Sequence, residues 1–313
     1  MMQYLVILLD DTSVSYCHCD LPDSKRVTAC DHRGANPHTE RRLIGLEDLK
    51  AGILYAMKQN LMIQFVYPDY ELPQEYRDVI DTIDHHDIVP FPMSGDVVVG
   101  GVEENAVCVL RMCKKELFIS GDVVSGMLTK VSRLNIVITD LETFADGDLK
   151  RYAELLDRWA AVLKEEYMKG RAPQLNLLTD RMMLTGPNHC NAGVENLTLA
   201  PNGRYYLCPA FYYSDPDDSI DPQAIPNPQL LRLDHAPLCR HCDAYHCRRC
   251  VWLNRKMTYE VNTPSREQCT VAHTEREAAR KLLAAIRQVG DFMPEVEIKE
   301  LKYNDPFEVR KEW

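Results

Sequence analysis

Apolar residues in the first half of the chain fall into short continuous runs that alternate with helical repeats. Residues 4–9 form one such run, closed by two aspartates, which predicts a buried strand. Residues 46–57 carry apolar side chains at spacings of three and four, which predicts an amphipathic helix. Further strands are expected at 61–67, 88–91, 96–101, 107–112, 135–139 and 175–178, and further helices at 75–83, 121–134 and 148–170. This alternation favours parallel pairing with right-handed crossovers, hence an α/β sheet or partial barrel.

The pattern changes near residue 185, where turns, prolines and cysteines replace the helical repeat. Alternating apolar residues on either side of Asn202-Gly203 predict a β-hairpin, with Gly203 supplying the positive φ of its turn. The acidic, proline-rich stretch 214–228 predicts a surface loop. A capping-box pattern at Thr274 and Glu277 predicts the start of a final helix.

Composition and charge narrow the class of protein. The 313 residues are 45% hydrophobic and 27% charged, which is typical of a packed globular protein rather than a disordered one. A net charge of -11 argues against nucleic acid or an anionic membrane as the main partner. The apolar run at 4–9 is too short for a signal sequence or a membrane span, so we expect a cytoplasmic protein. The run of Asp and His at 84–87 is expected to be a solvated loop.

Cysteine is distributed unevenly, because seven of the twelve cysteines lie between residues 190 and 269. Cys190 and Cys208 flank the predicted hairpin, which would bring them together. Downstream, two residues separate the cysteines of each of two pairs, a spacing that lets one tight turn place both sulfurs on one metal centre. The full downstream series is Cys239-x2-Cys242-x4-Cys247-x2-Cys250, then Cys269 after eighteen residues. Without a targeting segment, metal or iron-sulfur ligation is favoured over disulfides.

The order of these cysteines resembles the SPASM domain, the auxiliary-cluster module found after the barrel of many radical S-adenosylmethionine (SAM) enzymes. Gly203-x4-Cys208 matches that family's first part, and two later spacings are each one residue shorter than its pattern. The resemblance implies two 4Fe-4S clusters, one held by Cys239, Cys242, Cys247 and Cys269 and the other by Cys190, Cys208 and Cys250. The second cluster would have an open iron, a water or His189 as its fourth ligand. Zinc at one or both sites is the alternative, and His189, His241 and His246 are otherwise expected to be polar loop residues.

A catalytic radical SAM barrel carries Cys-x3-Cys-x2-Cys after its first strand, and this chain lacks that motif. The corresponding loop holds Cys17-x-Cys19 and then Cys30, which are either ordinary reduced thiols or, with His18 and His32, a further metal site. Binding of SAM is therefore not expected, and the first half resembles a degenerate relative of the barrel. Cys108 and Cys113, in apolar surroundings, are expected to be small core residues.

This combination resembles the CXXX repeat peptide maturase family, which accompanies radical SAM maturases and Cys-repeat precursor peptides. It implies a degenerate radical SAM-like, partial TIM-barrel-like α/β domain at 1–184, a SPASM-like Cys-rich domain at 185–272, and a C-terminal helix and tail at 273–313. The implied partners are a Cys-rich precursor peptide and an active maturase, with peptide binding or electron transfer as the role. Two alternatives stay open: an enzyme that modifies the peptide without a SAM cluster, and a zinc-stapled binding module.

Overall fold

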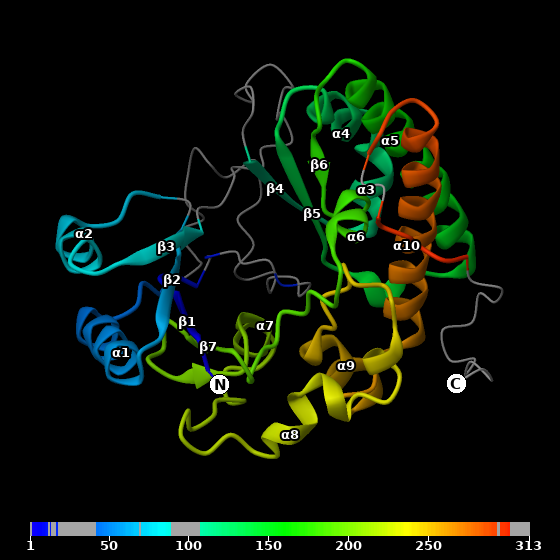
Figure 1. The fold of residues 1–313 in the computed structure, drawn as a ribbon. Coiled ribbons are helices and arrows are strands. Elements are labelled where there is room, and N and C mark those ends of the chain that lie inside the picture. Colours follow the sequence, from blue (N-terminus) through cyan, green and yellow to red (C-terminus); the bar gives the residue numbers. More distant parts are fainter. Residues whose placement is uncertain are drawn as a thin grey trace. The chain divides into compact units, whose positions relative to one another are not determined.

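The computed structural model describes residues 2–11, 13, 17, 42–68, 70–88, 107–292 and 295–300. The chain divides into two compact units, each built from two separate stretches of sequence (Figure 1). Unit 1 comprises Met1–Gly95 and Cys190–Ala236, and unit 2 comprises Asp96–His189 and Pro237–Trp313. These units group stretches of chain that contact one another, whereas the domains expected from the family resemblance are continuous in sequence. The expected domain boundaries stay a prediction.

Unit 1 contains a mostly parallel sheet in the strand order β3-β2-β1-β7-β8. Its strands are β1 (Tyr4–Leu8), β2 (Met62–Val66), β3 (His85–Ile88), β7 (Asn196–Leu199) and β8 (Tyr205–Tyr206). Its α-helices are α1 (Leu46–Gln59), α2 (Gln74–Ile80), α7 (Pro209–Ser214) and α8 (Pro228–Leu231), followed by the short 3-10 helix η4 (Leu233–His235). Strand β1 pairs in parallel with both β2 and β7, and β8 is the one antiparallel strand among those described.

The central position of β1 follows from its continuous apolar run, since a strand buried on both faces needs apolar side chains at every position. Leu5, Ile7 and Leu8 are completely buried. Helix α1 packs closely on the sheet, because a Cβ added to Gly52 would lie 2.2 Å from a methyl carbon of Leu199. The strands and helices expected at 4–9, 46–57, 61–67 and 75–83 are confirmed within a few residues.

The predicted loop at 84–87 is wrong, because His85 to Asp87 lie in β3 and pair with β2. This strand ends the described sheet and none of its side chains is fully buried, so no apolar run marks it. The predicted hairpin is confirmed: β7 and β8 pair antiparallel, and Gly203 has a φ of 76° in the turn. The predicted loop at 214–228 is also confirmed, with none of its side chains buried.

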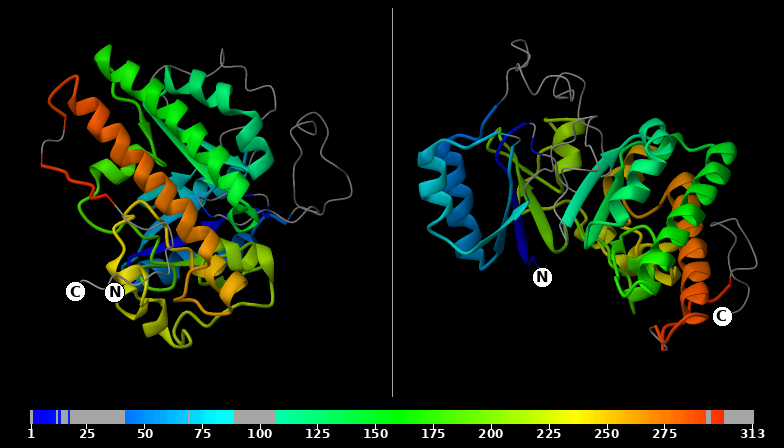
Figure 2. Two further views of the ribbon diagram at one scale, coloured as in Figure 1. Left: turned by 90° about the vertical axis from the view of Figure 1, so that its right-hand side faces the viewer. Right: turned by 90° about the horizontal axis from the view of Figure 1, so that it is seen from above.

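Unit 2 contains a parallel sheet in the order β4-β5-β6. Its strands are β4 (Val107–Met112), β5 (Arg133–Ile138) and β6 (Gln174–Leu175). Its helices are α3 (Lys114–Ile119), α4 (Gly121–Leu128), η3 (Leu141–Thr143), α5 (Asp146–Met168), α6 (Thr179–Met183), η5 (Cys239–His241), α9 (Val251–Thr258) and α10 (Arg266–Arg287). Helices α5 and α10 run side by side (Figure 2). Trp159 of α5 is fully buried, and its indole N–H donates to the Gly121 carbonyl at 3.0 Å.

Two helix boundaries in unit 2 differ from expectation. The helix expected at 121–134 ends at Leu128, and Arg133 already belongs to β5. The final helix begins at Arg266 rather than near Thr274, because the Ser265 hydroxyl accepts the Gln268 N–H and caps it earlier. The expected strand at 96–101 lies outside the described residues.

The fold class is α/β, with parallel strands dominating both sheets. None of the helices in the described part of the chain combines the length and the apolar character that a membrane crossing requires.

Candidate metal centre

Four of the predicted ligands, Cys239, Cys242, Cys247 and Cys269, lie in unit 2 on short turns and one helix start. Cys239 begins the 3-10 turn η5 and Cys242 directly follows it; the Cys242 N–H donates to the Cys239 carbonyl at 3.1 Å. The Cys247 N–H donates to the Ala244 carbonyl at 2.9 Å in the next turn. Cys269 lies in the first turn of α10. The two-residue spacing of Cys239 and Cys242 therefore forms the tight turn that the sequence predicted.

The four thiols lie close enough to influence one another electrostatically. Burial and, to a smaller extent, the neighbouring Cys242 thiol together raise the pKa of Cys239 to about 11. Burial raises the pKa of Cys247 to about 12, with added contributions from Cys239 and Cys242. The pKa of Cys269 is raised even more strongly by burial and then by the other three thiols. One partly enclosed environment thus holds all four sulfurs, and metal binding there would displace their protons.

Several N–H groups point at these sulfurs. The Sγ atom of Cys242 accepts the Ala244 backbone N–H at 3.4 Å and lies 3.4 Å from Nε2 of His273. The Arg249 backbone N–H bonds to Cys247, and the Arg249 side chain bonds to Cys239; both hydrogen bonds lower the thiol pKa against the effect of burial. N–H donors favour the thiolate over the thiol, and the thiolate is the form that binds metals.

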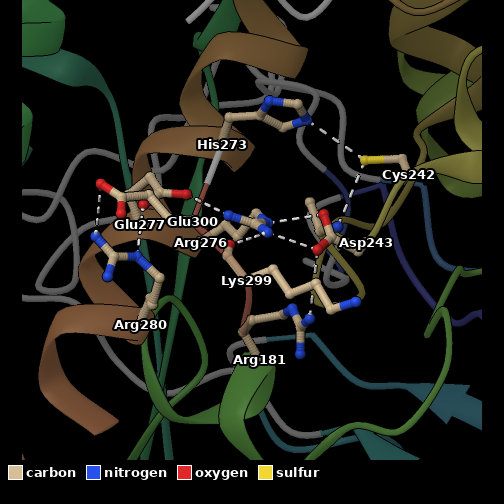
Figure 3. A network of polar contacts seen from close by, with 10 residues as sticks. Arg181, Cys242, Asp243, His273, Arg276, Glu277, Arg280, Lys299 and Glu300 are labelled. Atoms are coloured by element: carbon tan, nitrogen blue, oxygen red, sulfur yellow. Dashed lines mark hydrogen bonds and ion pairs between the residues drawn. The ribbon is translucent and has the colours of Figure 1, made fainter. Parts of the chain in front are cut away.

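A buried ionic network adjoins Cys242 (Figure 3). Arg276 is completely buried and donates two hydrogen bonds to the Asp243 carboxylate, at 2.7 and 2.6 Å. Arg181, 3% exposed, lies 3.8 Å from the same carboxylate and stacks over the Tyr245 ring at 4.5 Å. The guanidinium groups of Arg276 and Arg181 both oppose the burial effect that raises the Cys242 pKa.

A second buried polar chain runs from α5 through α10 to the loop before Cys247. The Tyr152 hydroxyl donates to Glu275 at 2.5 Å, and the other oxygen of Glu275 lies 3.0 Å from Nε2 of His246. His246 lies in a turn, as expected of a polar loop residue, but its side chain is only 3% exposed. Its Nδ1 atom is buried and has no hydrogen-bond partner in the described part of the chain.

The three-cysteine set is divided between the units. Cys190 and Cys208 belong to unit 1, where Cys208 is buried and precedes α7. Cys250 belongs to unit 2, where its sulfur caps α9 by accepting the Leu253 N–H at 3.4 Å. His189 is anchored by a 2.9 Å hydrogen bond between Nδ1 and the Cys247 carbonyl, and its Nε2 is buried. Convergence of these residues on one cluster stays a prediction.

Of the five cysteines outside the 190–269 series, the structure describes Cys17, Cys108 and Cys113. Cys108 is 1% exposed in β4 and is the core residue that the sequence predicted. Cys113 is only half-buried, so its expected core position is wrong: it caps α3, and its backbone N–H donates to Glu116 at 2.8 Å. Cys17 is described alone, while Cys19 and Cys30 fall outside the described residues with His18 and His32, so that possible site stays a prediction.

Within the described ranges, no group of three or more His, Cys, Asp or Glu side chains is arranged so that it could hold a metal ion. The test of fit therefore rests on donor chemistry. Four half-buried thiols that interact electrostatically, with N–H donors directed at three of them, match the ligands that zinc and iron-sulfur centres both use.

Sequence reasoning missed several residues around the thiols: Arg181, Arg249, His273, Glu275 and Arg276. These polar residues follow no spacing rule, because their partners come from other elements. A signal for two of them existed, since charged residues at 275 and 276 sit on the helix face that also carries apolar Ala279 and Leu282.

Comparison with protein-family models finds no match to this chain, and comparison with the curated proteins finds none either.

Proposed function

We propose that this chain is an iron-sulfur protein that takes part in maturing a Cys-repeat ribosomal peptide, as a peptide-binding or electron-transfer partner of an active radical SAM maturase. The observation that carries the metal part is the set of four coupled thiols at Cys239, Cys242, Cys247 and Cys269. The peptide and the maturase rest on the family resemblance of the cysteine spacing. A 4Fe-4S cluster at these thiols would store and release one electron.

The charges around the thiols support a centre with bound thiolates. Four thiolates on either a zinc ion or a 4Fe-4S cluster leave a net negative charge, and a buried charge is costly unless opposite charges lie nearby. Arg181, Arg249 and Arg276 supply three such cations, each at most 3% exposed. Two of them lower the pKa of Cys242 and the third lowers that of Cys239.

We further propose that Cys190, Cys208 and Cys250 hold a second 4Fe-4S cluster. The fold that we propose with it is a degenerate radical SAM-like partial barrel followed by a SPASM-like module. His189 suits the fourth ligand position, because anchoring Nδ1 on a backbone carbonyl leaves Nε2 as the lone-pair nitrogen. Metal-ligating histidines are commonly oriented by such a hydrogen bond.

The test is the content of iron, acid-labile sulfide and zinc per chain, measured on protein prepared without oxygen, with electron paramagnetic resonance of the reduced sample. About four iron and four sulfide per cluster are expected. Cys242→Ser should remove one centre, while Cys108→Ser, which changes a buried core thiol of β4, should leave the metal content unchanged.

Zinc without a paramagnetic signal would overturn the iron-sulfur proposal and make the segment a zinc-stapled module. Full metal content in the Cys242→Ser protein would overturn the ligand assignment. The role in peptide maturation is tested separately, by co-purification of the iron-loaded chain with a Cys-repeat peptide, against the same peptide with serine at every cysteine.

A further inference from the structure

Cys242 differs from the other three thiols of the centre because an imidazole contacts its sulfur. Nε2 of His273 lies 3.4 Å from Cys242 Sγ, within the range of a hydrogen bond to sulfur (Figure 3). His273 reaches this sulfur from α10, one turn after Cys269. The contact therefore links a thiol of the η5 turn to the helix that carries the fourth cysteine.

The chemistry of His273 decides the direction of this hydrogen bond. Nε2 is the ring nitrogen that faces the Cys242 sulfur. A neutral imidazole carries one N–H, and a metal-bound thiolate can only accept. The proton therefore sits on Nε2 and is donated to sulfur. Nδ1 is left as a buried acceptor, with no partner among the residues that the structure describes.

We propose that His273 is a positioning residue that donates a hydrogen bond to the Cys242 thiolate and thereby raises the reduction potential of the cluster at Cys239, Cys242, Cys247 and Cys269. This inference rests on the proposed function. One-electron reduction adds negative charge to the cluster, and a donor to a ligand sulfur stabilises the more negative state more than the oxidised one. Arg249 supplies a comparable donor to Cys239.

The experiment compares wild-type protein, His273→Leu and His273→Gln, each prepared without oxygen and titrated potentiometrically while the signal of the reduced cluster is followed by electron paramagnetic resonance. Loss of the donor in His273→Leu should lower the midpoint potential. We expect about a tenfold smaller ratio of reduced to oxidised cluster at the wild-type midpoint, which corresponds to about 59 mV for one electron. His273→Gln retains an N–H donor and should restore most of the shift. His86→Leu, an exposed position on β3, is the matched control.

A His273→Leu protein with full iron content and an unchanged midpoint would overturn the inference while leaving the proposed function intact. Absence of iron from the wild-type protein would instead overturn the proposed function. If His273→Leu loses its cluster, pulsed electron paramagnetic resonance of the wild-type and His273→Gln proteins tests for magnetic coupling between the reduced cluster and a histidine nitrogen. A histidine nitrogen coupling that is present in wild type and lost in His273→Gln supports the contact, and identical spectra refute it.

Discussion

Replacing Arg276 by methionine tests how much the buried ionic network contributes to the stability of unit 2. Arg276 is completely buried and makes a two-point contact with Asp243, and its Nη2 also donates to the Lys299 carbonyl at 2.6 Å. Removing one partner of a buried ion pair costs about 3–5 kcal/mol. Here the cost is smaller, because the Asp243 side chain is 27% exposed and keeps Arg181 at 3.8 Å. We therefore expect a loss of about 2–3 kcal/mol.

The assay is thermal unfolding followed by intrinsic fluorescence, where 1 kcal/mol shifts the Tm of a chain of this size by about 2 °C. Arg276→Met should thus lower the Tm by about 4–6 °C. Arg280→Met is the matched control one turn later, since Arg280 is 28% exposed and contacts Glu277 and Glu300 at the surface. Surface pairs contribute about 0–1 kcal/mol, so that variant should lose at most about 2 °C. Equal Tm values for the two variants would refute the reasoning.

Three further predictions concern other parts of the molecule. The thiol pKa values of Cys239 and Cys247 are raised above their unfolded values, so their contribution to stability is present below about pH 8.5 and is lost as the pH rises towards 11–12. The Tm of metal-free wild-type protein should fall more steeply above that pH than the Tm of Cys247→Ala, and parallel curves would contradict this. Gly203→Ala should cost about 1–3 kcal/mol in chemical denaturation, because it places a side chain at a φ of 76° and its methyl group approaches a carboxylate of α1 to 2.9 Å; an unchanged midpoint would refute it. Tyr152→Phe should destabilise the protein by about 1–3 kcal/mol, since Glu275 loses a buried donor, and a gain in Tm would count against this account.

Local signals in the sequence predicted much of the fold. Strand β1 has a continuous apolar run, helix α5 has a strong helical repeat, and Asn202-Gly203 marks the hairpin turn, so each could be found from neighbouring residues alone. The start of α10 was misplaced because two capping patterns compete, Ser265-x-x-Gln268 and Thr274-x-x-Glu277. In the structure the Thr274 hydroxyl bonds back to the Thr270 carbonyl at 2.9 Å, as it does in a helix interior.

Strand β3 and the environment of the thiols were harder to predict for a physical reason. His85 to Asp87 form a strand because β2 offers a backbone edge, and the backbone pairing does not require apolar side chains at the end of a sheet. His246 is buried because Glu275, 29 residues away in sequence, supplies its partner. Such pairings depend on which helix packs against which loop, and a single sequence carries little information about that.

The charge balance around the thiols bears on which metal the site suits. Zinc and a 4Fe-4S cluster, each with four thiolates, carry roughly two net negative charges, so the buried guanidinium groups of Arg181, Arg249 and Arg276 accommodate both. The two centres differ when an electron is added, because zinc has no redox chemistry whereas the cluster becomes more negative. A hydrogen-bond donor such as His273 stabilises the cluster most after the cluster has gained the electron. Its contact with Cys242 would favour the thiolate in either centre, but only in the proposed cluster would it also shift a reduction potential, and the potential of the His273→Leu protein measures that effect directly.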